Sequence, residues 1–370
     1  GRYEESISWV EEVAALPPPD LPAVAARTLA YLLLTCIARG DIDTAVTRLD
    51  EAVAAAATAP EPRHPALQLV APLGRAFTGD PALLDEVSVT SDDPWVRAFA
   101  TQVRAQLAEN DGDIELQRGL VRVAHELFTT TGDRFGLGMT IGTLGELEDL
   151  AGNLDAAAAA YDEALALATE LGNDDDLPQF MLQQARLSLR RGDPVRAREL
   201  AESAADIASG PFGVETMARA TLADIERVAG NLAAARRHLA VAERDAGHGL
   251  AREQRRALVE IVRYRVEVAA GDGEAAAASL DRAIDEAIAS HDGPVAALVV
   301  EYGAQFALAR GDADAAGLML GVALGVRDAL GPAAADDALQ RGRDLPRPDG
   351  LAAVRDRVRA PIPGDQARLR

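Results

Sequence analysis

A short motif recurs along this chain: a glycine, then Asp or Asn, then an alanine-rich segment. Six copies are clear, and two, at Gly79 and Gly112, are degenerate. We call their glycines the repeat glycines: Gly40, Gly79, Gly112, Gly152, Gly192, Gly230, Gly271 and Gly311. Successive repeat glycines lie 33 to 41 residues apart, and a regular period of this length is typical of a solenoid of stacked units. Such a chain offers a long surface rather than a catalytic pocket.

Each unit is predicted to be a pair of antiparallel helices. The repeat glycine ends the first helix, because glycine adopts a left-handed conformation that other residues resist. The Asp or Asn that follows can cap the second helix. Small or apolar residues then recur at spacings of four and three, as at Ala157, Tyr161 and Ala164, so they share one helix face. We expect that face to pack between the unit's own first helix and the next unit.

The composition favours an all-α fold. Hydrophobic residues make up 48% of the 370 residues but aromatic residues only 4%, so apolar contacts must come mainly from Ala, Leu and Val. Alternating runs of β-branched residues, which would indicate strands, are hard to find. The chain is also longer than a single core usually allows, and repetition of small units resolves this.

The charge and the absence of sorting signals limit the partners. The formal net charge is −22, so nucleic acids and anionic membrane surfaces would repel the chain. No basic run offsets this charge, and the acidity is most simply a means of staying in solution. The sequence shows no signal peptide and no apolar span of membrane length. We therefore expect a cytoplasmic protein that contacts neither nucleic acid nor membrane directly.

Nothing in the sequence points to catalysis. Lys is absent, so neither a Walker A loop nor a Schiff base can form. Cys36 is the only cysteine, which excludes an intrachain disulfide and a Cys-based metal cluster. No His-Glu-x-x-His motif and no Gly-x-Ser-x-Gly elbow occur, although one sequence leaves a Ser-His-Asp triad open. We expect no enzymatic activity, no cofactor and no metal ion.

The repeat pattern also predicts a division of the chain. Residues 1–57 hold N-terminal units, of which the first is truncated, because Gly1 falls at the place of a repeat glycine. Since initiator Met is also missing, we expect a piece of a longer protein. Residues 58–94 are rich in proline and should form short helices and turns as a joint. The main array is expected over 95–330, capping helices over 331–360 and a disordered tail over 361–370.

The units resemble the tetratricopeptide repeat, with the pattern Gly-Asp-x-x-x-Ala-x-x-x-aromatic/Leu-x-x-Ala. The best match is AGNLDAAAAAYDEALALATELGN, which ends at Asn173. The standard period is 34 residues, so these units carry longer joints. The resemblance implies a tetratricopeptide-like α-α superhelix, a solenoid of antiparallel helix pairs.

Two segments carry a narrower resemblance. HELFTTTGDRFGLGMTIGTLG begins at His125, and AAGLMLGVALGVRDALG begins at Ala315. Both are similar to the C-terminal tetratricopeptide region of actinobacterial SARP-type and LuxR-type transcription regulators, in which a DNA-binding domain and a STAND-type ATPase precede a helical array. This resemblance implies a sensor module that controls an ATPase and DNA-binding part absent from this chain. The alternatives are a free-standing scaffold for protein–protein interaction and, more remotely, an α-solenoid enzyme.

The resemblance also implies a binding groove, because the first helices of tetratricopeptide units line the concave face. Counting back from the repeat glycines by the family's spacing places these residues in the groove: Arg27, Glu146, Arg186, Asp224, Arg265, Glu301 and Gln305. Mixed charges on neighbouring helices suit a protein, a peptide or a polar small ligand. The alternative is an ordinary solvated face with ion pairs between units.

The helix from Phe135 to Gly145 is unusual, because it contains four glycines. Gly145 occupies the family's own packing position. Each of the others weakens the helix by about 0.8–1 kcal/mol relative to Ala, so it calls for close helix approach, a bend or room for a ligand. Close packing is the simpler interpretation. The other is an apolar pocket walled by Phe135 and Met139 beside Gly142.

Overall fold

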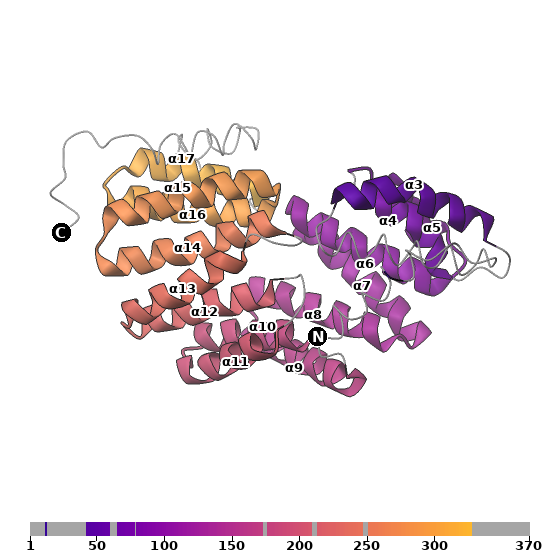
Figure 1. The fold of residues 1–370 in the computed structure, drawn as a ribbon, viewed down its shortest axis with the longest axis horizontal. Helices are drawn as coiled ribbons and strands as arrows, with labels where there is room; N and C mark the ends of the chain where they lie inside the picture. The colour runs from indigo at the N-terminus through magenta and orange to yellow at the C-terminus, as the bar shows by residue number, and fades with distance from the viewer. Residues whose placement is uncertain are drawn as a thin grey trace.

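The computed structural model describes residue 12 and residues 42–59, 65–77, 79–172, 176–208, 213–246 and 251–327. These residues form helices and contain no strand (Figure 1). The elements are α3 (Ile42–Thr58), η1 (Pro65–Leu69), α4 (Val70–Phe77), α5 (Ala82–Thr90), α6 (Pro94–Asp111), α7 (Ile114–Thr131), α8 (Arg134–Leu150), α9 (Leu154–Leu171), α10 (Leu177–Arg190), α11 (Pro194–Ile207), α12 (Val214–Val228), α13 (Leu232–Asp245), α14 (Arg252–Ala270), α15 (Gly273–Ser290), α16 (Gly293–Ala309) and α17 (Ala313–Arg327). The predicted cap over 331–360 and the predicted tail over 361–370 lie outside the described residues.

From α6 onward the chain is a solenoid of antiparallel helix pairs. Each even-numbered helix packs most extensively on the next odd-numbered one, and each pair then packs on its successor (Figure 1). The first helices α10, α12, α14 and α16 also contact one another across units. The all-α tetratricopeptide-like fold predicted from the sequence is thus confirmed. Before α6, the proline-rich stretch holds η1, α4 and α5, and α5 packs on α6.

Left-handed turns separate the helices at every joint from α6 onward. All repeat glycines from Gly79 to Gly311 have φ between 74° and 93°, as the sequence predicted for helix ends. A second series of left-handed residues stands between the units: Gly132, Gly172, Gly213, Ala251 and His291. This second series repeats every 38 to 41 residues, with φ from 54° to 70°. The chain therefore reverses direction at one left-handed residue within each unit and at one between successive units.

The capping prediction holds for Asp and is wrong for Asn. Asp113 and Asp193 each accept a hydrogen bond from the backbone N–H three residues later, at 2.9 and 3.0 Å. Asn153 and Asn231 make no such cap. Their side-chain amides instead donate to a glutamate at the end of the preceding helix, Asn231 to Glu226 at 2.8 Å. An amide can donate to a carboxylate whereas an aspartate would repel it, which explains Asn at these positions.

The same glutamates join neighbouring units. In three places an arginine six residues after one repeat glycine reaches a glutamate four residues before the next. These inter-unit clamps are Arg118–Glu148, Arg198–Glu226 and Arg236–Glu267. Glu226 is thus held from two sides, by the guanidinium of the preceding unit and by the amide of Asn231.

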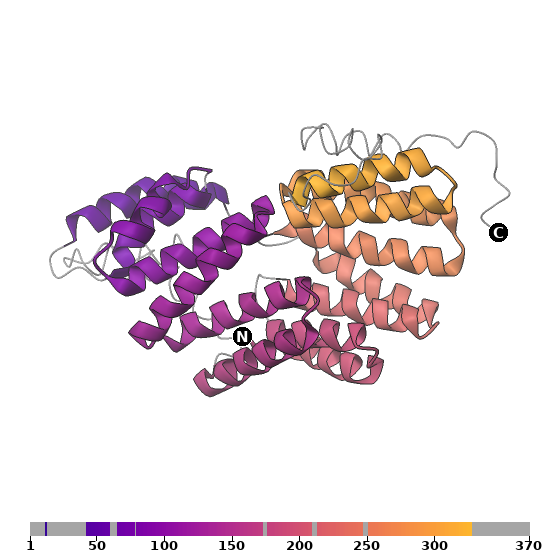
Figure 2. The ribbon, with the colours of Figure 1, turned by 180° about the vertical axis from the view of Figure 1, so that it is seen from behind.

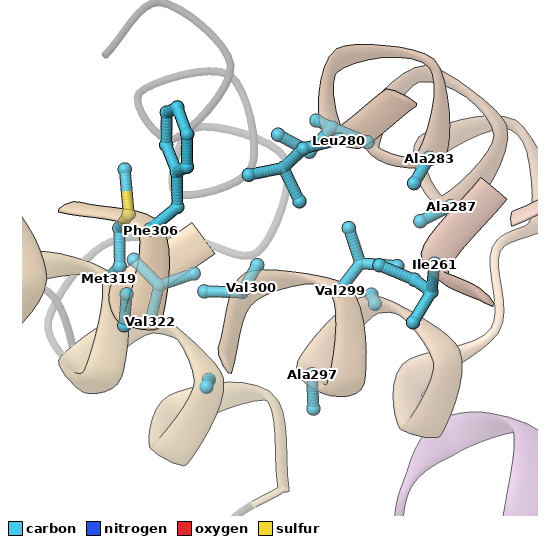
Figure 3. Close-up of a cluster of buried hydrophobic side chains, with 14 of the residues drawn as sticks. Ile261, Leu280, Ala283, Ala287, Ala297, Val299, Val300, Phe306, Met319 and Val322 are labelled. Atoms are coloured by element: carbon cyan, nitrogen blue, oxygen red, sulfur yellow. The ribbon is translucent and has the colours of Figure 1, made fainter. Parts of the chain in front are cut away.

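Alanine dominates the buried faces, and a few large side chains fill what remains. In the last units, Leu280 from α15 faces α16, which carries Val299 and Phe306, and Met319 from α17 lies beside Phe306 (Figure 3). The matched alanines of the repeat, such as Ala283, are fully buried in the same cluster. Small residues let the helices approach closely, so the array is stabilised with few aromatic rings.

Helix α8 makes room for the largest of those rings. A Cβ added at Gly136, Gly142 or Gly145 would lie within 2.7 Å of an aromatic ring. The rings come from three neighbouring helices: Phe128, Phe180 and Tyr161, in the same order. At Gly138 an added Cβ would meet nothing within 4 Å. Three of the four glycines therefore serve close packing.

The array curves until its last units meet its first. The start of α16 contacts the end of α6, two helices far apart in the sequence (Figures 1 and 2). The approach is tight, because a Cβ added at Gly293 would lie 3.0 Å from the carbonyl oxygen of Asn110. We call this meeting of α6 and α16 the closing contact. It turns the first helices from α6 to α16 into the wall of a ring.

The two kinds of glycine in α8 predict opposite effects of alanine. Gly142→Ala should destabilise the protein by about 1–3 kcal/mol, because its Cβ would strike the buried Phe180 ring. Gly138→Ala should be neutral or stabilising by up to about 1 kcal/mol, because the space is open and Ala favours a helix. Urea unfolding of both variants measures the difference. Equal effects of the two substitutions would show that the Phe180 ring does not determine whether α8 tolerates alanine at these positions.

The clamp at Glu226 predicts a dependence on acid pH. Its hydrogen bond from Arg198 lowers the pKa of Glu226 below the ordinary value of 4.5. The clamp should therefore stabilise the fold above pH 4.5 and lose its effect as the pH falls through the lowered pKa. Glu226→Gln should cost about 1 kcal/mol at pH 7, a modest amount because solvent screens the partly exposed Arg198. Thermal unfolding from pH 7 to pH 3 should show the difference shrinking, while the exposed Glu202→Gln should match the parent throughout.

Candidate functional site

The candidate site is the inner wall, the face of the ring that α6, α8, α10, α12, α14 and α16 line. One position recurs on it, six residues before each repeat glycine. We call this set the inner ladder: Gln106, Glu146, Arg186, Asp224, Arg265 and Gln305. The charges of its four central members alternate along the wall, and its two end members are exposed amides. Five of the seven groove residues predicted from the sequence belong to this ladder.

The first charged pair joins α8 to α10. Glu146 accepts a hydrogen bond from the amide of Gln183, and the guanidinium of Arg186 lies close enough to favour its ionised form. Burial nevertheless raises the pKa of Glu146 above its ordinary value. Burial likewise lowers the pKa of Arg186, against the attraction of Glu146. The two groups are therefore desolvated on the wall and depend on each other for charge compensation.

The second charged pair joins α12 to α14. Arg265 Nη1 lies 2.9 Å from Asp224 Oδ2, and Arg227 Nε donates to Asp224 Oδ1 at 2.7 Å. Asp224 is only 7% exposed, so one buried carboxylate holds two guanidinium groups at once. Because Asp224 fixes both arginines, this part of the wall presents donors in defined positions.

Apolar side chains flank the inner ladder. Two helical turns before the ladder, the same helix face carries a partly exposed apolar residue on five of the six first helices. These residues form the apolar row: Phe99, Met139, Met217, Leu258 and Leu298. Near the other end of the helices, Val228, Val268 and Leu308 are exposed two or three residues before their repeat glycines. The wall thus offers polar groups in the middle with apolar surface on both sides.

The remaining predicted residues fall in different places. Arg27 lies outside the described residues. Glu301 lies one turn before Gln305 on α16, next to the inner ladder along the same helix. Phe135 is 47% exposed at the start of α8, and the space beside Gly142 holds the Phe180 ring. Of the three residues predicted to wall an apolar pocket, Met139 belongs to the apolar row.

The sequence pattern did not single out several residues that the wall brings together. Gln183 and Arg227 complete the two charged pairs, and Asp149 on α8 forms an ion pair with Arg190 on α10. Gln183, Arg190 and Arg227 share no fixed distance from a repeat glycine with residues of like chemistry, whereas Asp149 and Glu109 both stand three residues before one. Gln117 could have been noticed in the sequence, because it stands at the position where the clear copies of the repeat have Ala.

A separate hollow of about 320 Å³ lies between α13, α14 and α15. Charged side chains line it, among them Glu260, Arg282 and Glu286. Arg282 binds both carboxylate oxygens of Glu260 at 3.0 Å, so much of the lining is already paired. No group of three metal-ligating side chains that could hold an ion occurs among the described residues. Within the same residues, every helix is too short or too polar to cross a bilayer.

Three solved structures are similar to this chain to different degrees. A Rap protein complexed with Competence and Sporulation Factor is similar over 83% of this chain and 98% of its own, at 11% identity and a TM-score of 0.53. A STAND protein with a tetratricopeptide repeat sensor from Pyrococcus horikoshii matches over 96% of this chain and 52% of its own, at 11% identity and a TM-score of 0.45. BtubC from P. vanneervenii matches over 66% and 88%, at 15% identity and a TM-score of 0.37.

At such identities the likeness to the Rap protein shows the fold alone, and the two lower TM-scores carry no further argument. No protein-family model and no curated protein matches the sequence. The chain is thus a tetratricopeptide-like helical repeat protein, and its function has to be argued from the inner wall.

Proposed function

We propose that the inner wall binds an extended peptide, either free or as a segment of a partner protein. The observation that carries this proposal is the inner ladder, six matched polar positions on six consecutive first helices. An extended peptide presents N–H donors and C=O acceptors at regular intervals, and amide and charged side chains at regular intervals suit both. The apolar row beside the ladder would receive the peptide's apolar side chains.

The charge compensation within the wall favours a peptide over a strongly charged ligand. Glu146 faces Arg186, and Asp224 faces Arg265, so no single sign dominates the centre of the ladder. A polyanion would have to compete with these carboxylates, and the chain as a whole is already at −22. A peptide has both donors and acceptors, so when it binds it can form individual hydrogen bonds with the guanidinium groups and with the carboxylate groups.

We further propose that this binding has a regulatory purpose. The resemblance to the tetratricopeptide region of STAND-type transcription regulators supports a sensor arm that would control an ATPase and DNA-binding part lying elsewhere in the parent protein. The Rap protein of similar fold was solved with Competence and Sporulation Factor bound, which supports a signalling ligand for this class of array. Sequencing the gene upstream of Gly1 tests the regulatory half, and an ATPase domain there is the expected result.

Reversing the charge of two ladder arginines tests the binding half. Phage-displayed random heptapeptides would be selected on the purified chain, and the tightest peptide would be measured by calorimetry. Arg186→Glu combined with Arg265→Glu should weaken binding at least about tenfold, because the introduced glutamates would repel the peptide groups that the two arginines are proposed to hold.

The matched control is Arg122→Glu with Arg244→Glu, which makes the same charge change on the exposed outer helices α7 and α13. It should bind like the parent. Circular dichroism of both double variants checks that the helices remain. Equal affinity of the inner and outer variants, with helicity intact, would place the peptide away from the inner ladder and refute the proposal.

A further inference from the structure

The closing contact brings together groups that the sequence keeps far apart. Glu109 lies in the last turn of α6, and Asp292 caps the start of α16, where its carboxylate accepts from Val295 N at 2.7 Å. Asp292 is buried, and Gly293 beside it packs against the backbone of Asn110. Two acidic residues therefore approach each other where the ring closes.

Among the described residues, Glu109 has an acidic environment and no cation to balance it. From α8 it faces Glu146, and from α16 it faces Asp292, both of which disfavour its ionisation. From α7 it meets only the neutral amide of Gln117, and it has no ion pair within the part of the chain that the structure describes. Burial, then Glu146, then Asp292 raise the pKa of Glu109 to about 8.

Gln117 gives an independent sign that Glu109 carries a proton here. Its Nε2 donates to Glu109 Oε2 at 3.1 Å, whereas its Oε1 is buried without a hydrogen-bond partner in the described structure. Gln117 is 2% exposed and stands where the six clear copies of the repeat have alanine, so its amide is enclosed beside the carboxyl group. An ionised Glu109 can only accept, but a protonated one can donate to the orphan oxygen and complete a paired acid–amide contact.

We propose that Glu109 is a proton-operated clasp: the α6–α16 contact is closed while Glu109 is protonated against Gln117, and it opens when Glu109 loses its proton. Loss of the proton leaves Gln117 Oε1 without a donor and adds a negative charge opposite Asp292 and Glu146. The added charge repels Asp292 across the α6–α16 contact, and separation of the two helices would let water reach the ionised carboxylate and the orphan amide oxygen.

The direction of the pH effect follows from the two states. In an open ring Glu109 is hydrated and would ionise nearer the ordinary carboxyl range, whereas in the closed ring its pKa is about 8. Closure is therefore most favoured at low pH and weakens progressively as the pH rises toward 8. Since the closed ring encloses the inner wall, the clasp would set how freely a peptide reaches the ladder. That consequence rests on the proposed function, but the clasp itself does not.

Distance measurements without any ligand test the clasp. Spin labels would be placed by Val123→Cys on α7 and Ala313→Cys on α17, both exposed, in the full chain with Cys36→Ser. Between pH 6.5 and pH 9 the electron–electron distance should shift from a short to a longer population, and the change should be complete once the pH exceeds about 8. Glu109→Gln, which is neutral at every pH, should keep the short distance throughout.

Two further variants secure the interpretation. Glu115→Gln removes an exposed carboxylate from α7 and should leave the pH response unchanged. Gly293→Ala should give the longer distance even at pH 6.5, because its Cβ would crowd the Asn110 carbonyl. A wild-type distance that is the same at both pH values, or a Glu109→Gln variant that still responds to pH, would overturn the proposal. Neither result depends on peptide binding, which is measured separately.

Discussion

The left-handed turns within and between the units are the constraint on which the rest of this structure depends. A helix pair can stack on the next only if the chain reverses sharply and at nearly constant intervals. Positive φ at Gly152, within a unit, and at Gly172, between units, supplies the two reversals. Because the interval hardly changes, each first helix returns to the inner wall in the same register. The inner ladder and the inter-unit clamps exist only because that register is kept.

Close helix approach is the second consequence of the sequence, and it explains the low aromatic content. Matched alanines such as Ala157 and Ala164 are fully buried, so neighbouring helices can pack with little side-chain volume between them. The few large rings then need specific room, and α8 gives it by omitting three side chains. Phe180 lies where Gly142 lacks a Cβ, and it belongs to the buried cluster that includes Ile141. Close packing, the simpler interpretation of these glycines, therefore explains three of them.

The sequence could predict what is local and repeated. The repeat glycines, the helix pairs and the ladder positions all follow from fixed distances along the chain. The turns between units were harder, because Ala251 and His291 adopt the left-handed conformation without the glycine that signals it. Asn231 misled for a different reason: it has the chemistry of a cap, but the neighbouring Glu226 offers its amide a stronger acceptor. Such choices depend on side chains that local patterns do not bring together.

The closing contact shows where a one-dimensional pattern stops. Every unit obeys local rules, yet the meeting of α6 with α16 depends on the curvature accumulated over all the units between them. No interval along the chain relates Glu109 to Asp292, and their proximity appears only when the array is built. A departure from the repeat was nevertheless visible, since Gln117 replaces an alanine at a buried position. No cation balances the Glu109 carboxyl group beside it among the described residues, and the Gln117 amide is the neutral hydrogen-bond partner that takes the place of one. In this repeat protein, the unit that departs from the pattern at Gln117 is thus the one that takes part in a contact between distant units, which the units between them do not make.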